Sequence, residues 1–181
     1  MTLADKKIAF LFTKGVEQVE FTSPRDALDG AGATTVLISP EEGTVQAMQG
    51  DWEHGDVFDV DVPLADARAE DYDMLVLPGG TLNADSLRLE TEAVDFVKAF
   101  FDAGKPVAAI CHAPWILANA GLASGRSLTS YASLETDLRN AGADWRDEEV
   151  VVDGTLITSR NPGDLDAFNA AIAKALETPE P

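Results

Sequence analysis

The chain has 181 residues, 45% of them hydrophobic, and this length suits one well-buried core better than two. Its 13 basic and 32 acidic residues give a formal net charge of −19, which argues against nucleic acid or an anionic membrane as a partner because both are polyanions. One cysteine and two histidines form neither an internal disulfide nor a convincing zinc site, so we expect no structural metal and no cofactor.

The acidic residues are spread along the whole chain and are not gathered into a tail. Such a surface repels itself at low ionic strength, whereas molar salt shortens the Debye length to about 3 Å and screens the repulsion. The plain interpretation is a solvated acidic surface; our hypothesis is a halophilic protein from a salt-rich cytoplasm. A membrane segment is not expected, because no run approaches the roughly 18 apolar residues that it requires. Charged Asp5, Lys6 and Lys7 precede the first apolar run, unlike in a secretory signal, so we expect a cytoplasmic protein.

The first third of the chain reads as a βαβ unit. Residues 7–12 form a short apolar run typical of a strand buried on both faces. Residues 19–32 have a helical pattern, with Pro24 expected in the first turn, and residues 34–39 form the next strand. Residues 40–72 are acidic and weakly periodic, and could form the edge strands of a small meander at Val57, Val60, Val62 and Leu64.

Strands and helices continue to alternate after residue 72. The pattern predicts strands at 73–77, 106–110, 128–130, 150–152 and 156–158, and helices at 91–103, from Cys111 to near Gly121, and at 165–176. This alternation predicts an α/β fold, with a mostly parallel sheet covered by helices on both faces. We expect a single domain that spans residues 1–181.

Cys111 lies at the predicted turn from a buried strand into a helix. A residue at such a turn projects above the carboxyl edge of the sheet, where open α/β folds bind ligands. A helix N-terminus would stabilise a thiolate and lower the pKa of Cys111. The alternative is a small buried core cysteine, with the adjacent His112 as a capping or packing residue.

Several ordered blocks of the sequence resemble the PfpI/ThiJ family of the class I glutamine amidotransferase-like superfamily. The blocks are GVEQVEF at 15–21, LVLPGG at 75–80, GKPVAAICH at 104–112, LTSY at 128–131, NAGA at 140–143 and TSRNP at 158–162. The resemblance covers nearly the whole chain and implies a flavodoxin-like three-layer sandwich with a nucleophile elbow.

The resemblance also implies roles for matching residues. Cys111 corresponds to the nucleophile, His112 to its neighbouring base, and Glu17 to the carboxyl group that hydrogen-bonds the sulfur and exchanges protons with substrate. A carboxyl in a partly apolar pocket beside a thiolate has its pKa raised and can donate a proton. Gly80 and the backbone N–H of His112 correspond to the oxyanion hole. Tyr131 resembles a tyrosine near the pocket, with packing as an equal alternative.

Glu20, in contrast, looks structural, and two positions depart from the family pattern. Ala113 stands where glycine is common after the Cys-His pair. The acid that orients the histidine in hydrolytic members comes from a neighbouring subunit, and Asp85 matches it only with a shift of one residue; a surface aspartate is the alternative. The resemblance implies a homodimer or a hexamer built from dimers.

Three functions remain open at this point. The resemblance implies a stress-response enzyme that acts on reactive carbonyls as a glyoxalase or deglycase, with Cys111 adding to an α-oxoaldehyde or its glycation adduct. The second function is an intracellular cysteine peptidase that uses Cys111, His112 and Asp85 on a peptide substrate. The third is a non-catalytic chaperone or a redox sensor in which Cys111 is oxidised.

Overall fold

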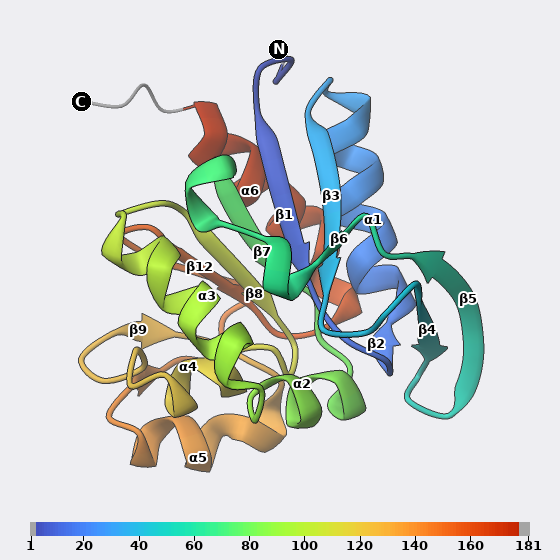
Figure 1. Ribbon diagram of the computed structural model, residues 1–181. Helices are drawn as coiled ribbons and strands as arrows, with labels where there is room; N and C mark the ends of the chain where they lie inside the picture. Colours follow the sequence, from blue (N-terminus) through green and yellow to red (C-terminus); the bar gives the residue numbers. More distant parts are fainter. Residues whose placement is uncertain (1–2, 178–181) are drawn as a thin grey trace.

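A computed structural model describes residues 3–177 of the chain. Its centre is a seven-stranded sheet with the order β11-β12-β8-β7-β1-β3-β6 (Figure 1). The strands are β1 (Lys7–Leu11), β3 (Thr34–Ser39), β6 (Val62–Pro63), β7 (Met74–Leu77), β8 (Val107–Ile110), β11 (Val150–Asp153) and β12 (Leu156–Ser159). Every neighbouring pair is parallel except β11 with β12, so the predicted mostly parallel sheet is confirmed.

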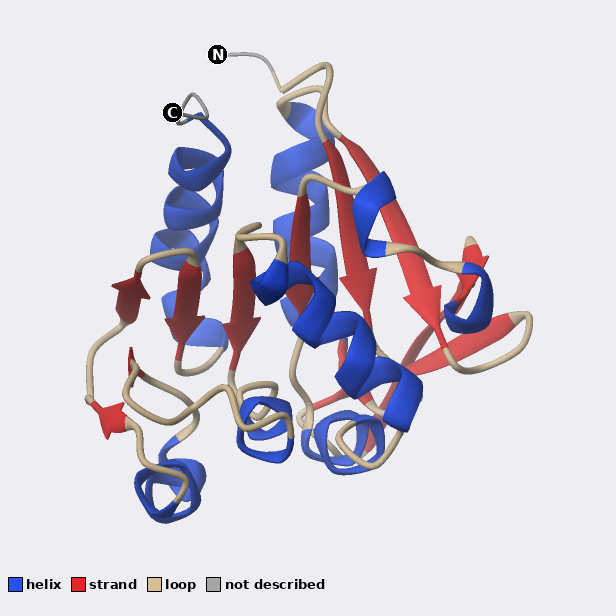
Figure 2. Cartoon of the chain, turned by 60° about the vertical axis from the view of Figure 1, so that its left-hand side comes forward, coloured by secondary structure: helices blue, strands red, loops and turns tan. Residues whose placement is uncertain are grey.

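Helices cover both faces of this sheet (Figure 2). The helices α1 (Gln18–Gly30) and α6 (Leu165–Glu177) lie on one face, and α3 (Thr91–Asp102) lies on the other. Successive strand residues alternate between the two cores: Ile8 and Phe10 pack with the first pair of helices, while Ala9 and Leu11 pack with α3. The three-layer, flavodoxin-like sandwich predicted from the sequence is confirmed.

The remaining helices lie near the carboxyl ends of the parallel strands (Figure 1). They are α2 (Thr81–Leu87), α4 (Trp115–Asn119) and α5 (Glu135–Asn140), and a two-stranded parallel pair of β9 (Ser127–Leu128) and β10 (Asp144–Trp145) adjoins them. The sequence pattern missed α2 and α5, because both are short. No helix within residues 3–177 has the length and apolar character that crossing a membrane requires.

The acidic segment that follows β3 forms a hairpin beside the main sheet. Its strands β4 (Thr44–Gln49) and β5 (Glu53–Asp59) are antiparallel, and β2 (Val16–Glu17) pairs with β4 to complete a three-stranded sheet. The predicted meander is thus replaced by one hairpin plus β6, which joins the edge of the main sheet. The hairpin turn follows Gln49 and lies close to the carboxyl edge (Figure 1).

The strand predicted at 128–130 is shorter, since β9 ends at Leu128, and the predictions for Pro24 and for a helix start at Cys111 are wrong. Pro24 lies inside α1 and not in its first turn, since the helix begins at Gln18. Cys111 does not begin a helix: α4 starts only at Trp115, and the residues between form a tight turn. The sulfur therefore lies a full turn ahead of that helix.

The halophilic interpretation can be tested by measuring how the stability of the purified protein depends on salt. Since the net charge of −19 repels itself most strongly in dilute buffer, the thermal midpoint should rise between dilute buffer and molar KCl. Differential scanning calorimetry at several KCl concentrations measures this rise. A midpoint in dilute buffer at least as high as in molar salt would contradict the halophilic interpretation.

Candidate active site

Cys111 follows β8 in a strained backbone conformation. Its φ is 62°, a left-handed value that is uncommon for a residue with a side chain. Two backbone hydrogen bonds hold it there: Cys111 N–H donates to the Ser159 carbonyl at 3.0 Å, and Tyr131 N–H donates to the Cys111 carbonyl at 2.7 Å. The predicted elbow between strand and helix is therefore present, although the helix begins later. The Cys111 side chain lies in a nearly closed site, with 6% of the residue exposed.

His112 pairs with this cysteine through its Nδ1 atom, which lies 3.2 Å from Cys111 Sγ. The imidazole stacks on Tyr131, with ring centroids 4.6 Å apart, so the structure brings this tyrosine to the site as well. Burial lowers the pKa of His112, which favours a neutral imidazole near neutral pH. A neutral imidazole can act as a base toward the thiol.

The carboxyl group beside the sulfur belongs to Glu20, and the expected position of Glu17 is wrong. Glu17 Oε2 accepts a hydrogen bond from the Gly50 N–H at 2.8 Å, on the hairpin side of the site. Glu17 lies in β2, one residue before α1, whereas Glu20 lies in the first turn of that helix and points inward. Glu20 is fully buried, and its Oε2 accepts from the Gly79 N–H at 2.9 Å.

The sequence contained a signal for this difference. Glu20, Pro24 and Leu28 recur at a spacing of four residues and form the buried stripe of α1, so an acid occupies an otherwise apolar face. A carboxyl group on such a face needs a polar partner or a raised pKa. The prediction of a purely structural Glu20 did not account for the free-energy cost of burying its carboxyl group.

The ionisation of Glu20 and that of Cys111 are coupled. Burial raises the pKa of Glu20 to about 8, which leaves the carboxyl largely protonated at neutral pH. Burial and the charge of Glu20 also raise the pKa of the Cys111 thiol, while the backbone N–H groups of Gly80 and His112 lower it. The net direction is opposite to the lowered pKa expected from a helix N-terminus. The site therefore holds a thiol at rest and needs a base to release its proton.

The Glu20 carboxyl interacts with the Cys111 thiol, but within residues 3–177 its Oε1 atom has no hydrogen-bond partner of its own. Glu20 Oε1 is buried and accepts no hydrogen bond from the residues that the structure describes. A buried polar atom without a partner costs free energy and marks a place where a bound molecule or a transferred proton can be accommodated. Glu20 thus has one oxygen fixed by Gly79 and one available for chemistry.

The two predicted oxyanion donors both lie within reach of the sulfur. Both Gly80 N–H and His112 N–H interact with Cys111 Sγ. Gly80 has a φ of 88°, and a Cβ atom there would clash with the Gly15 carbonyl oxygen, so only glycine fits. The backbone can therefore bring an N–H group close to the nucleophile.

Asp85 does not contact His112 within this chain. Its carboxylate is exposed and binds Arg88 at 2.8 Å and 3.1 Å. The role of Asp85 across a subunit boundary stays a prediction. Nε2 of His112 instead faces two hydroxyl groups that the sequence did not suggest, Thr81 Oγ1 at 3.4 Å and Ser133 Oγ at 3.3 Å.

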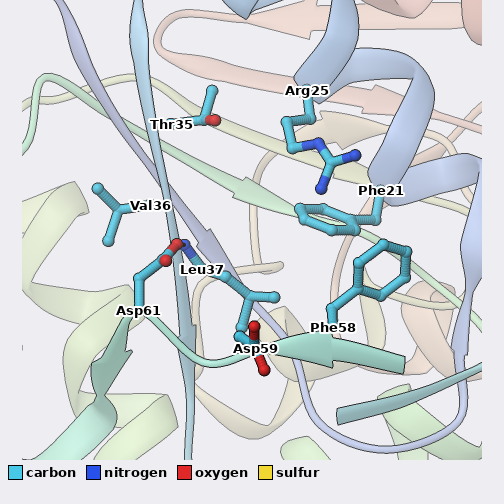
Figure 3. Close-up of a pocket in the computed structure, with 8 residues that line it drawn as sticks. All are labelled: Phe21, Arg25, Thr35, Val36, Leu37, Phe58, Asp59 and Asp61. Atoms are coloured by element: carbon cyan, nitrogen blue, oxygen red, sulfur yellow. Dashed lines mark hydrogen bonds between the residues drawn. The ribbon is translucent and has the colours of Figure 1, made fainter. Parts of the chain in front are cut away.

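The described residues show no other site of comparable chemistry. Residues 3–177 contain no group of three or more His, Cys, Asp or Glu side chains placed to hold a metal ion. A pocket of about 220 Å³ lies between α1, β3 and β5 (Figure 3), where Arg25 packs on the rings of Phe21 and Phe58. None of the predicted site residues lines it.

Comparisons with known proteins identify the family of this chain. The model of the DJ-1/PfpI family matches residues 6–175. The chain is 43% identical over 164 residues to "Putative cysteine protease YraA" of Bacillus subtilis, covering 91% of this chain and 94% of that protein. It is 42% identical over 174 residues to "Uncharacterized protein SAV1875" of Staphylococcus aureus, covering 95% and 99% of the two chains.

The solved structures that resemble this chain include DJ-1/ThiJ/PfpI proteins. Drosophila melanogaster DJ-1beta superposes with a TM-score of 0.85 at 34% identity, covering 97% of this chain and 91% of that one. A two-domain protein of Anabaena variabilis, with DJ-1/ThiJ/PfpI-like and ferritin-like domains, gives a TM-score of 0.88 at 37% identity. That alignment covers 94% of this chain but 48% of the other, so this chain spans about half of it. The family match, these relatives and the cysteine elbow together show that the chain belongs to the DJ-1/PfpI family.

Proposed function

We propose that this chain is a cysteine-dependent enzyme of reactive carbonyls, with a glyoxalase or deglycase type of activity on α-oxoaldehydes or their glycation adducts. The observation that supports it most is Glu20: a buried carboxyl beside Cys111, with a pKa raised to about 8 and one oxygen without a partner. Carbonyl isomerisation needs a group that both donates and accepts a proton near the nucleophile.

The residues of the site can perform each proton transfer. His112 Nδ1 takes the thiol proton, and Cys111 Sγ forms a bond to the aldehyde carbon as the C=O π pair moves onto oxygen. The N–H groups of Gly80 and His112 stabilise that oxygen until it takes up a proton, which gives a hemithioacetal. Glu20 then acts in its ionised fraction: the carboxylate removes the proton from this carbon and returns it to the neighbouring carbon, while the hydroxyl proton passes to the neighbouring oxygen. The resulting thioester is hydrolysed by water to a 2-hydroxy acid and the free thiol.

An intracellular cysteine peptidase is the second candidate. The name of the Bacillus subtilis relative and the 3.2 Å contact between Cys111 and His112 favour it. A peptide amide has a leaving amine that must be protonated, and His112 in its protonated form would supply that proton. This reaction does not need Glu20 as a shuttle, which distinguishes it from the carbonyl reaction.

Turnover of two substrates by the wild-type protein and by Cys111→Ala tests the proposal. We expect the wild type to convert methylglyoxal to lactate, measured by loss of the dicarbonyl and by chiral product analysis, and to leave casein intact. Cys111→Ala should lose this activity completely, because the covalent step has no substitute. Cleavage of casein without methylglyoxal turnover would support the peptidase, and no turnover of either substrate would contradict both enzyme functions.

A further inference from the structure

A series of hydrogen bonds leads from the β4–β5 hairpin to the imidazole of His112. Asp51 Oδ1 accepts from the Thr81 N–H at 2.9 Å, and Asp51 Oδ2 accepts from the Thr81 hydroxyl at 2.7 Å. The oxygen of that hydroxyl lies 3.4 Å from His112 Nε2. Because Nδ1 of the same ring lies 3.2 Å from Cys111 Sγ, one hydroxyl and one imidazole join a carboxylate to the nucleophile.

Only one assignment of the protons satisfies every hydrogen bond in this series. A carboxylate only accepts hydrogen bonds, so the Thr81 hydroxyl must use its one O–H group as the donor to Asp51. The hydroxyl oxygen can then only accept, which requires a proton on Nε2 of His112. In a neutral imidazole this leaves the lone pair on Nδ1, the atom that faces the thiol. Ser133 Oγ, at 3.3 Å, can accept from the same Nε2–H.

The backbone is left-handed at the two ends of the series. Within residues 3–177, Asp51 and Cys111 are the two non-glycine residues with positive φ, at 63° and 62°. Such conformations cost free energy and persist only where the surroundings over-determine them. At Asp51 the hairpin turn itself requires this conformation, which aspartate tolerates well, whereas at Cys111 it holds the nucleophile at the end of β8.

The hairpin that carries Asp51 is fastened to the start of α1. Glu17 binds the Gly50 N–H immediately before Asp51. Gln18 accepts from the Asp56 N–H at 2.6 Å and donates to the Asp56 carboxylate at 2.8 Å. Glu17 therefore holds the hairpin turn that contains Asp51.

We propose that Asp51, acting through Thr81, is the positioning residue that fixes His112 in its Nε2–H tautomer and thereby makes Nδ1 the base for Cys111. The proposal rests on Cys111 being the nucleophile of the proposed function, but it does not depend on which substrate the cysteine attacks. It also supplies an acid for the histidine within one chain, so the site does not require Asp85 of a second subunit.

Nitrogen-15 NMR of histidine-labelled protein at neutral pH tests this directly. The chain has two histidines, and His54→Gln identifies the signals of His112. We expect a protonated Nε2 and an unprotonated Nδ1 in the wild type. In Asp51→Asn, the Asn Nδ2 group donates to Thr81 Oγ1, the hydroxyl turns its proton toward Nε2, and the proton of the ring moves to Nδ1.

The rate of alkylation by iodoacetamide is the second measurement, and it does not involve a carbonyl substrate. With the lone pair turned away from the thiol, Asp51→Asn should react about 10²-fold more slowly, at the lower end of general-base effects. Asp51→Gly keeps the left-handed turn without strain and removes the carboxylate, so it should also lower the rate. Thr81→Ser keeps the hydroxyl and should retain the wild-type tautomer and rate.

Asp59→Asn is the matched control, because it makes the same change on an exposed residue of the same hairpin. It should leave both measurements unchanged. An Asp51→Asn protein and an Asp51→Gly protein that keep the Nε2–H tautomer and the wild-type alkylation rate would overturn the proposal. If methylglyoxal is not a substrate but the tautomer changes as expected, the positioning role holds and only the proposed function fails.

Discussion

Glu20→Gln should lower kcat for methylglyoxal by about 10² to 10⁴-fold, the usual range for a lost general acid or base. Glutamine keeps the size of the side chain, and its carbonyl oxygen can still accept from the Gly79 N–H. It has no proton to exchange, so addition of Cys111 to the aldehyde can proceed while transfer between the two carbons stops. Stopped-flow and steady-state assays on the purified variant measure this loss.

Cys111 in the Glu20→Gln variant should remain at least as reactive toward iodoacetamide as in the wild type. Glu20 raises the pKa of the thiol in its ionised form, and glutamine cannot ionise, so this effect is absent from the variant. Glu92→Gln, an identical change on an exposed residue of α3, serves as the control and should behave like the wild type. Near wild-type turnover in Glu20→Gln would show that Glu20 is a structural neighbour only.

The pH dependence of stability provides an independent signature of Glu20. Its pKa is raised from 4.5 in the unfolded chain to about 8 in the folded one, so the folded state holds a proton that the unfolded state has released. The contribution of Glu20 to the free energy of unfolding is therefore fully present below pH 4.5 and is lost as the pH rises through about 8. Denaturant melts of wild type and Glu20→Gln across this interval should show a weaker decline in the variant.

The main sheet could be predicted from the sequence because its signals are local. Residues 36–38 and 107–110 are continuous apolar runs, as expected of strands buried between two layers. The elbow at Cys111 could also be predicted, because a residue that directly follows a parallel strand lies at the carboxyl edge of the sheet. Short helices such as α2 give no repeating pattern and were not predictable by periodicity.

The carboxyl groups of the site could not be assigned so easily. Glu17 and Glu20 lie in one sequence block, and the residue at which α1 begins decides which of them faces the sulfur. Helix ends are the least certain part of any pattern, and a shift of one residue rotates a side chain by about 100°. The role of Asp51 could not be predicted for a different reason. Asp51 lies 30 residues before Thr81 in the sequence, and its segment has no clear hydrophobic period.

Gly79→Ala should disturb both the stability and the chemistry of the site. A Cβ atom there would lie 2.5 Å from Glu20 Oε2, 2.7 Å from Cys111 Cβ and 2.8 Å from the Ile110 carbonyl oxygen. The backbone cannot move aside freely, because the Gly79 N–H binds Glu20 and the Gly79 carbonyl accepts from Asn83 Nδ2 at 2.8 Å. The added methyl group must therefore push the carboxyl and the sulfur apart.

We expect this overpacking in Gly79→Ala to cost about 1–3 kcal/mol of the free energy of unfolding. Turnover should fall as far as in Glu20→Gln, because proton transfer depends on the distance between Glu20 and the carbon bound to Cys111. Gly30→Ala is the matched control: its Cβ would meet no atom within 4 Å, and the end of α1 should tolerate alanine. Urea melts measure the stability of both variants. A Gly79→Ala protein with wild-type stability and turnover would mean that Glu20 and Cys111 need not be held in close contact, and the proton-transfer role of Glu20 would lose its structural basis.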